Sequence, residues 1–173
     1  MILDVIQGDI LNPSNPNDII IGMNTELKEV FGIGLPFTWQ IQHKQPIPLG
    51  TVFSFEFDKE RRLHLIICHK IGTDGWTGAD KYIRFGMDYL WHTEPSNRTF
   101  SMVKVGTGHI GKRDGANVPD IMSAIASSHL PVTLYVYTPL EREAVEARAQ
   151  TPPSTLTAYR SWNFQEGEMA LAA

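Results

Sequence analysis

Residues 102–115 read MVKVGTGHIGKRDG and carry the strongest indication of the fold. This stretch begins as an apolar strand and passes directly into a loop with glycines at 106, 108 and 111. Strands that run into glycine-rich loops are typical of α/β folds, in which phosphate-bearing ligands bind beside the loop. Because this spacing partly matches two phosphate-binding motifs, the rest of the chain must decide between them.

Neither motif fits in full. A nucleoside-triphosphate loop requires Ser or Thr after its lysine to bind magnesium, but Arg113 follows Lys112. A dinucleotide loop normally lies in the first β–α turn, with an acidic residue about 20 positions later. Here the glycines come late, and the next apolar run, TLYVYT at 133–138, ends without an acid. A turn that binds no ligand stays open as an interpretation.

The rest of the chain alternates predicted strands and helices. We expect strands at residues 2–8, 18–24, 51–57, 62–70, 99–106 and 131–138, and helices at 36–43, 79–91, 117–130 and 140–150. From Thr151 the sequence predicts an irregular tail that contains Trp162 and Phe164. This alternation predicts a three-layer α/β/α domain with a mixed sheet, whose ligands bind at the carboxyl ends of the strands.

Composition limits the classes of function. The 173 residues are 42% hydrophobic and 20% charged, which favours one core, here expected over residues 1–140 with a helix and tail over 141–173. The net charge of −4 and the lack of a long Lys/Arg run do not favour a nucleic-acid partner, although a small nucleotide ligand stays open.

The same composition bears on location. Cys68 is the single cysteine, so no internal disulfide can form, which is consistent with a reducing cytoplasm. Asp4 interrupts the first apolar residues, which argues against a signal peptide, and no apolar run is long enough to span a membrane. We therefore expect a cytoplasmic protein without a membrane partner. The sequence does not indicate whether the protein is a monomer or an oligomer.

Six segments in order resemble the macrodomain family. They are GDI at 8–10, DIIIGMN at 18–24, FGIGLPF at 31–37, the hairpin at 49–72, VKVGTGHIG at 103–111 and VTLYVYT at 132–138. The resemblance covers about Ile2 to Leu140. It implies a macrodomain-like fold that binds ADP-ribose, or a free, conjugated or protein-linked derivative of it, between two glycine-rich loops, with no cofactor.

The resemblance also implies which residues contact the ligand. Asp9 and Ile10 would bind adenine, and Tyr137 would stack on it, although a core aromatic residue is an equal alternative for Tyr137. The phosphates and the distal ribose would lie against the backbone of two loops, composed of Gly32, Ile33, Gly34 and Leu35, and of Gly106, Thr107, Gly108, His109, Ile110 and Gly111.

Catalytic residues match the family less completely. The start of the chain, the hairpin and the last strand resemble small macrodomains that hydrolyse ADP-ribose from acidic side chains, and their lysine corresponds to Lys70. Their aspartate would stand at position 110, which is Ile110 here, while Asp114 lies four residues further on. Asn24 and His109 are the other candidates for catalysis.

Two classes of function therefore stay open. The first is a binding module for ADP-ribose or an ADP-ribosylated molecule, and the second is an ADP-ribosyl hydrolase or deacylase on the same scaffold. The ligand-contact residues favour the binding module, and a solvated strand-end lysine is the preferred interpretation of Lys70, because its partner acid is missing. No metal site is expected, because His64, Cys68 and His69 alternate between the faces of one strand.

Overall fold

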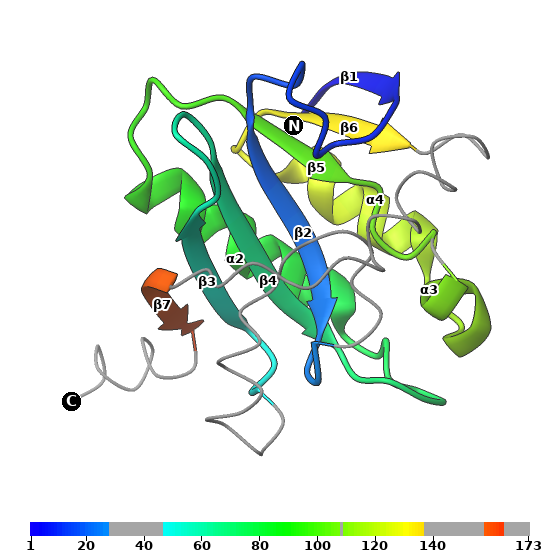
Figure 1. Ribbon diagram of the computed structural model, residues 1–173. Coiled ribbons are helices and arrows are strands. Elements are labelled where there is room, and N and C mark those ends of the chain that lie inside the picture. The colour runs from blue at the N-terminus through cyan, green and yellow to red at the C-terminus, as the bar shows by residue number, and fades with distance from the viewer. Residues whose placement is uncertain (28–46, 108, 137–157, 165–173) are drawn as a thin grey trace.

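The structure is a computed structural model, and it describes residues 1–27, 47–107, 109–136 and 158–164. Its centre is a seven-stranded sheet in the order β1-β6-β5-β2-β4-β3-β7 (Figure 1). The strands are β1 Ile2–Gln7, β2 Asp18–Asn24, β3 Thr51–Glu56, β4 Arg62–His69, β5 Phe100–Val103, β6 Val132–Val136 and β7 Ala158–Asn163. The described helices are α2 Ala79–Thr93, α3 His109–Asp114 and α4 Val118–Ser127.

The direction of the strands determines where a ligand can bind. Neighbouring strands are parallel from β1 through β6, β5 and β2 to β4. At the other side of the sheet, β3 pairs antiparallel with β4, and β7 pairs antiparallel with β3. The five parallel strands therefore end at the same edge, which we call the carboxyl edge. The predicted α/β class and mixed sheet are confirmed.

The central strand β2 is buried on both faces, as its continuous apolar sequence predicts. Ile20 packs in the core on one face, and Ile19 and Ile21 pack in the core on the other. A Cβ added to Gly22 would lie 2.8 Å from Val105, so the loop after β5 approaches the backbone of β2 closely. The glycine thus brings this loop against the end of the central strand.

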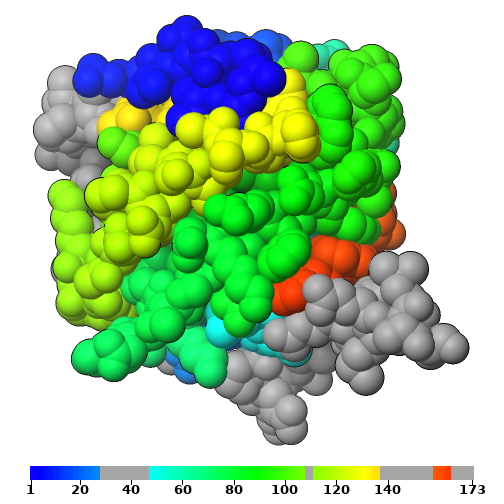
Figure 2. Space-filling model, turned by 180° about the vertical axis from the view of Figure 1, so that it is seen from behind, coloured from blue at the N-terminus to red at the C-terminus, as the bar shows by residue number. Residues whose placement is uncertain are grey.

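Helices α2 and α4 cover one face of the sheet, and Figure 2 shows them from that side. In α2, Ile83, Met87 and Leu90 recur at helical spacing and are fully buried. Asn117 caps α4, as expected, because its side chain accepts a hydrogen bond from the amide of Asp120. The helices predicted at 36–43 and 140–150 lie outside the described residues.

The C-terminal residues differ from the expected irregular tail. Residues 158–163 form β7, which pairs with β3 from Thr51 to Phe55 and becomes the edge strand of the sheet. Aromatic stacking holds it in place, because the ring centroid of Trp162 lies 4.2 Å from that of Tyr89 and that of Phe164 lies 4.5 Å from that of Phe85. Residues 158–163 are therefore part of the same sheet.

Candidate functional site

The carboxyl edge brings together loops that are far apart in the sequence. Backbone hydrogen bonds join their bases: the amide of Gly8 donates to Val136 at 2.9 Å, and the amide of Thr25 donates to His69 at 3.0 Å. At the end of β5, the amide of Lys104 donates to Tyr135 of β6 at 3.2 Å, so the loops after β1, β2, β4 and β5 all start from strands that are bonded within this edge. Such an edge is where open α/β sheets bind ligands.

Asp9 shapes the first of these loops. One of its carboxylate oxygens accepts a hydrogen bond from the amide of Leu11 at 3.0 Å, which closes a tight turn. The next residue, Ile10, is fully buried, and the Asn15 side chain donates to its carbonyl oxygen. Asp9 itself stays half-buried at the edge of the sheet. The carboxylate thus has a structural role in addition to the contact with adenine that the sequence predicts.

The loop after β5 requires glycine at two positions. Gly106 has a φ of +88°, a left-handed conformation that favours glycine. A Cβ added to Gly111 would lie 2.3 Å from the carbonyl oxygen of Gly106, so the two backbones are in direct contact. The Thr107 hydroxyl donates to the carbonyl oxygen of Lys104 at 2.6 Å and fixes the turn between them. This compact turn places backbone, rather than side chains, at the carboxyl edge.

Other predicted ligand contacts lie outside the described residues. They are Gly32, Ile33, Gly34, Leu35, Gly108 and Tyr137, together with the side chains of His109 and Ile110. Asn24 is described: it is buried at the end of β2, and its side-chain oxygen accepts from the amide of Glu26 at 3.0 Å. Asn24 thus forms the turn that leads out of the central strand.

The structure brings Asp114 to the loop that begins at Lys70, despite its shifted position in the sequence. One oxygen of Asp114 accepts from the amide of Gly72 at 2.9 Å, and the other accepts from Arg113 at 2.9 Å. The Arg113 contact and the Gly72 amide together lower the pKa of the Asp114 carboxyl. Asp114 is thus hydrogen-bonded to the loop that contains Lys70, although its position in the sequence does not match the family pattern.

Lys70 and His69 have contrasting surroundings. The Lys70 side chain is exposed, whereas His69 is buried and stacks on Trp76 with ring centroids 3.7 Å apart. Burial lowers the pKa of His69, which favours the neutral imidazole. His69 therefore packs against Trp76 beneath the surface and stabilises the loop that begins at Lys70, whereas Lys70 itself presents its ammonium group to solvent.

A pocket of about 510 Å³ adjoins Lys70. It lies where β4 ends and the chain enters β3, and its lining includes Thr25, Glu26, Ile47, Leu49, Lys70 and Tyr82. This volume is within the range of small-molecule sites. The pocket could not be predicted from the sequence, because its walls come from four separate segments.

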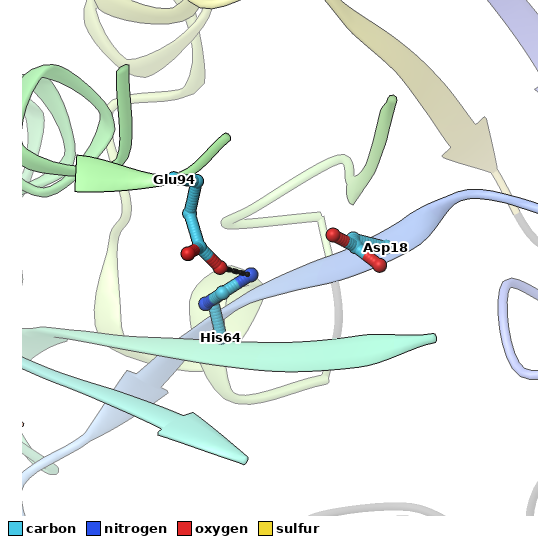
Figure 3. A group of neighbouring side chains, drawn as sticks. All are labelled: Asp18, His64 and Glu94. Carbon is cyan, nitrogen blue, oxygen red and sulfur yellow. Dashed lines mark ion pairs between the residues drawn. The ribbon is translucent and has the colours of Figure 1, made fainter. Parts of the chain in front are cut away.

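A second polar group, at the opposite edge of the sheet, was also missed from sequence. Asp18, His64 and Glu94 are buried, and one ligand atom of each lies within 4.8 Å of the others (Figure 3). Such residues could hold a divalent metal. Their carboxylates are already paired, however, since Asp18 binds Arg98 and Glu94 lies within 3.2 Å of Arg62 and Arg160.

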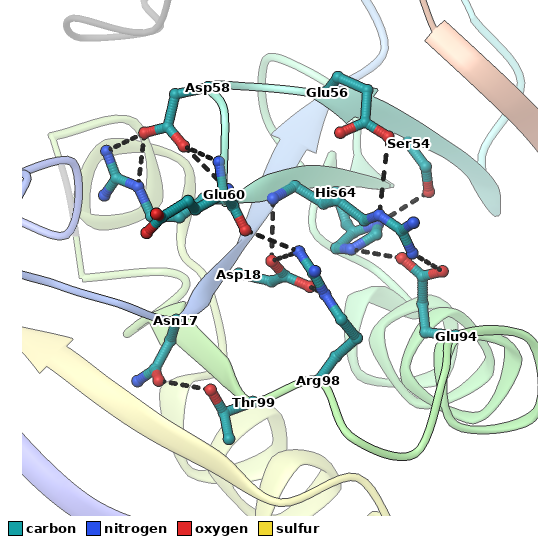
Figure 4. A network of polar contacts seen from close by, with 12 residues as sticks. Asn17, Asp18, Ser54, Glu56, Asp58, Glu60, His64, Glu94, Arg98 and Thr99 are labelled. Carbon is teal, nitrogen blue, oxygen red and sulfur yellow. Dashed lines mark hydrogen bonds and ion pairs between the residues drawn. The ribbon is translucent and has the colours of Figure 1, made fainter.

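The paired charges indicate a structural network rather than a metal centre (Figure 4). His64 lies between Glu94, at 3.0 Å, and the Ser54 hydroxyl, at 2.7 Å. This serine, histidine and carboxylate order resembles a nucleophilic relay, but Ser54 is 1% exposed and no substrate can reach it. Burial alone would raise the pKa of Glu94, but contacts with His64, Tyr159 and Arg160 lower it to about 2.

No helix among the described segments has both the length and the apolar character needed to cross a membrane. No family model matches the sequence, and no curated protein matches it. Among the solved structures that are similar to the chain, three each have a TM-score of 0.46.

The first is a macrodomain protein from Streptomyces coelicolor, 15% identical, with 78% of this chain and 99% of that chain covered. The second is the macrodomain of Thermus aquaticus DarG, also 15% identical, with 77% and 97% covered. The third is an alphavirus P23pro-zbd, 13% identical, with 87% of this chain and 24% of that chain covered.

Proposed function

We propose that the protein binds ADP-ribose, or a derivative of it, at the carboxyl edge of the sheet. One observation is central: strands β1, β2, β4 and β5 all end at this edge. The loops that follow them contain residues for which the sequence predicts contacts with this ligand. Adenine lies at Asp9, at the β1 end, and the distal ribose lies near Asn24, at the β2 end. The pyrophosphate lies between them, against the loop that begins at Gly106.

The backbone of this loop supports the proposal physically. The positions that a Cβ would take at Gly106 and Gly111 face the protein itself, so these glycines allow the turn to close tightly, and amide groups of such a turn can bind phosphate oxygens without a basic side chain. An acidic protein can therefore bind a doubly charged pyrophosphate. The buried Ile10 gives the adenine end of the site an ordered base, because its backbone is held by Asn15.

Hydrolysis of an ADP-ribosyl group is the second candidate, since Asp114, the last residue of α3, is bonded to the loop that begins at Lys70. Both oxygens of Asp114 accept hydrogen bonds within the protein, which leaves the carboxylate poorly suited to transfer a proton. We therefore favour binding without rapid turnover. A test is to incubate the protein with ADP-ribosylated glutamate peptide and to measure the ADP-ribose released by wild type and by Lys70→Ala.

Titration calorimetry tests the binding itself. ADP-ribose should bind more tightly than AMP, and AMP more tightly than adenine, because each smaller ligand lacks contacts along the edge. A ligand that binds only the folded state also raises its stability, by about 2.7 kcal/mol at one hundred times the dissociation constant. Absence of both heat and a thermal shift with saturating ADP-ribose would refute the proposal.

A further inference from the structure

We propose that the pocket beside Lys70 binds a carboxylate-bearing aliphatic group attached to the distal ribose of ADP-ribose. This inference rests on the proposed function, and it names the class of derivative that the site selects. The pocket has a volume of about 510 Å³, which is enough for a substituent of several carbon atoms next to the ribose.

Strand order places the pocket at the far end of the ligand. The sheet runs β1-β6-β5-β2-β4-β3, so a ligand that starts at Asp9 and passes the Gly106 loop reaches Asn24 on β2 last. The next strands along the edge are β4 and β3, and the pocket lies where β4 ends and β3 begins. A group attached to the distal ribose therefore enters the pocket.

The lining defines the chemistry of that group. Ile47 and Leu49 form an aliphatic wall, and Lys70 supplies an exposed ammonium group to which no described side chain is bonded. An aliphatic chain that ends in a carboxylate matches this combination, because the chain contacts the wall and the carboxylate pairs with Lys70. Glu26 also lines the pocket, and its repulsion of an anion limits the gain expected from the pairing with Lys70.

The C-terminal strand holds the wall of the pocket in position. The Asn163 side chain donates to the carbonyl oxygen of Leu49 at 3.2 Å and to the Thr51 hydroxyl at 3.0 Å. Phe164 packs over Gly50, where an added Cβ would lie 2.6 Å from its ring, and its ring centroid lies 6.0 Å from that of Tyr82. Two lining residues, Leu49 and Tyr82, thus contact the end of β7, and the pocket wall is fixed before a ligand arrives.

The experiment compares three ligands by calorimetry, and in the two substituted ones a stable ether bond joins the substituent to the ribose. They are ADP-ribose, ADP-ribose with a 3-carboxypropyl ether on the distal ribose, and the methyl ester of that ether, which lacks the charge. We expect the methyl ester to bind about 3-fold more tightly than ADP-ribose, through apolar contact. The carboxylate should bind about 10-fold more tightly than ADP-ribose, through the added ion pair at a solvent-exposed lysine.

Two variants that each remove one positive charge test whether Lys70 causes the tighter binding of the carboxylate. Lys70→Met should remove the advantage of the carboxylate over its methyl ester. Lys59→Met makes the same change in the exposed turn between β3 and β4, at the opposite edge, and should keep that advantage. Leu49→Asp should weaken both ethers relative to ADP-ribose, because it places a charge in the aliphatic wall.

The outcomes separate this inference from the proposed function. If ADP-ribose itself does not bind to wild type, the proposed function fails and the inference fails with it. If ADP-ribose binds but the carboxylate ether binds no more tightly, only the pocket assignment is overturned. The same conclusion follows if the advantage of the carboxylate persists in Lys70→Met.

Discussion

The carboxylate of Asp114 accepts a hydrogen bond from the backbone amide of Gly72, with oxygen and nitrogen 2.9 Å apart. This contact joins α3, which follows the Gly106 loop, to the loop that begins at Lys70. The two residues are 42 positions apart in the chain, so the bond is a tertiary link between two walls of the proposed site.

The first prediction concerns this link. Asp114→Ala should increase the rate of hydrogen exchange at the Gly72 amide, because the amide loses its acceptor. Arg113→Ala is the matched control: it removes the other partner of Asp114 and should leave the Gly72 amide protected. Unchanged protection in a folded Asp114→Ala variant would contradict the assigned bond.

The pH dependence of this link follows from its charge. Arg113 and the Gly72 amide lower the pKa of Asp114 from the ordinary value of 3.8, so the folded state favours the ionised carboxylate. The contribution to stability is therefore present above pH 3.8 and is lost as the pH falls through the lowered value. Wild type and Asp114→Ala should differ in melting temperature at neutral pH and converge in acid.

The second prediction concerns the glycine loop. Gly111→Ala places a Cβ at 2.3 Å from the Gly106 carbonyl oxygen, and backbone cannot yield as a flexible side chain would. The free energy of unfolding should fall by about 1–3 kcal/mol. ADP-ribose affinity should fall about tenfold or more, since the amides move. Lys112→Ala, one position further along α3, should bind as wild type does, and equal binding by both variants would show that the loop does not contact ligand.

The third prediction concerns the polar network. Glu94→Gln leaves His64, Arg62 and Arg160 without their shared anion. Loss of one partner from a buried ion pair costs about 3–5 kcal/mol. For Glu94→Gln we expect the free energy of unfolding, measured with urea at pH 7, to fall by about 2 kcal/mol, because Arg62 and Arg160 are partly exposed and solvent screens them.

The same variant has a defined pH dependence. The folded-state pKa of Glu94, about 2, lies below the ordinary value of 4.5, so its contribution is present above pH 4.5 and is lost as the pH falls toward 2. The difference between Glu94→Gln and wild type should shrink over that interval. Glu60→Gln, an exposed acid in the same region, should show little difference at any pH.

The fourth prediction concerns the C-terminal strand. Phe164→Ala removes a buried ring that stacks on Phe85 and packs over Gly50. Unfolding free energy should fall by about 2–4 kcal/mol, near the lower end for buried aromatic residues because β7 is an edge strand. Trp91→Ala deletes a larger side chain that is 47% exposed and should cost much less. If the two variants lose equal stability, β7 is not docked as described.

Much of the sheet was predictable from the sequence, because buried parallel strands are apolar runs of characteristic length. DIIIGMN and RLHLIICHK fit that pattern and form β2 and β4. β7 was missed since its sequence, AYRSWN, lies on an edge and mixes aromatic and polar residues. Its aromatic content was the available signal, because Tyr and Trp favour strands.

The proposed site was predictable only in part. Glycine spacing identified Gly106 and Gly111, because their backbone geometry is local. The contact between Asp114 and Gly72, the pocket beside Lys70 and the network around Glu94 depend on which strands are neighbours. Single-sequence patterns do not contain that information, since each group joins segments tens of residues apart.

The measurement that tests the central claim most directly is a titration of isotope-labelled protein with ADP-ribose, followed by backbone amide chemical shifts. If ADP-ribose binds at the carboxyl edge, the largest changes should occur at Asp9 to Leu11, Thr25, Lys70 to Ile71 and Gly106 to Thr107, with little change at Asp18, His64 and Glu94 on the opposite edge. Changes confined to that opposite edge, or none at saturating ADP-ribose, would contradict binding at the carboxyl edge.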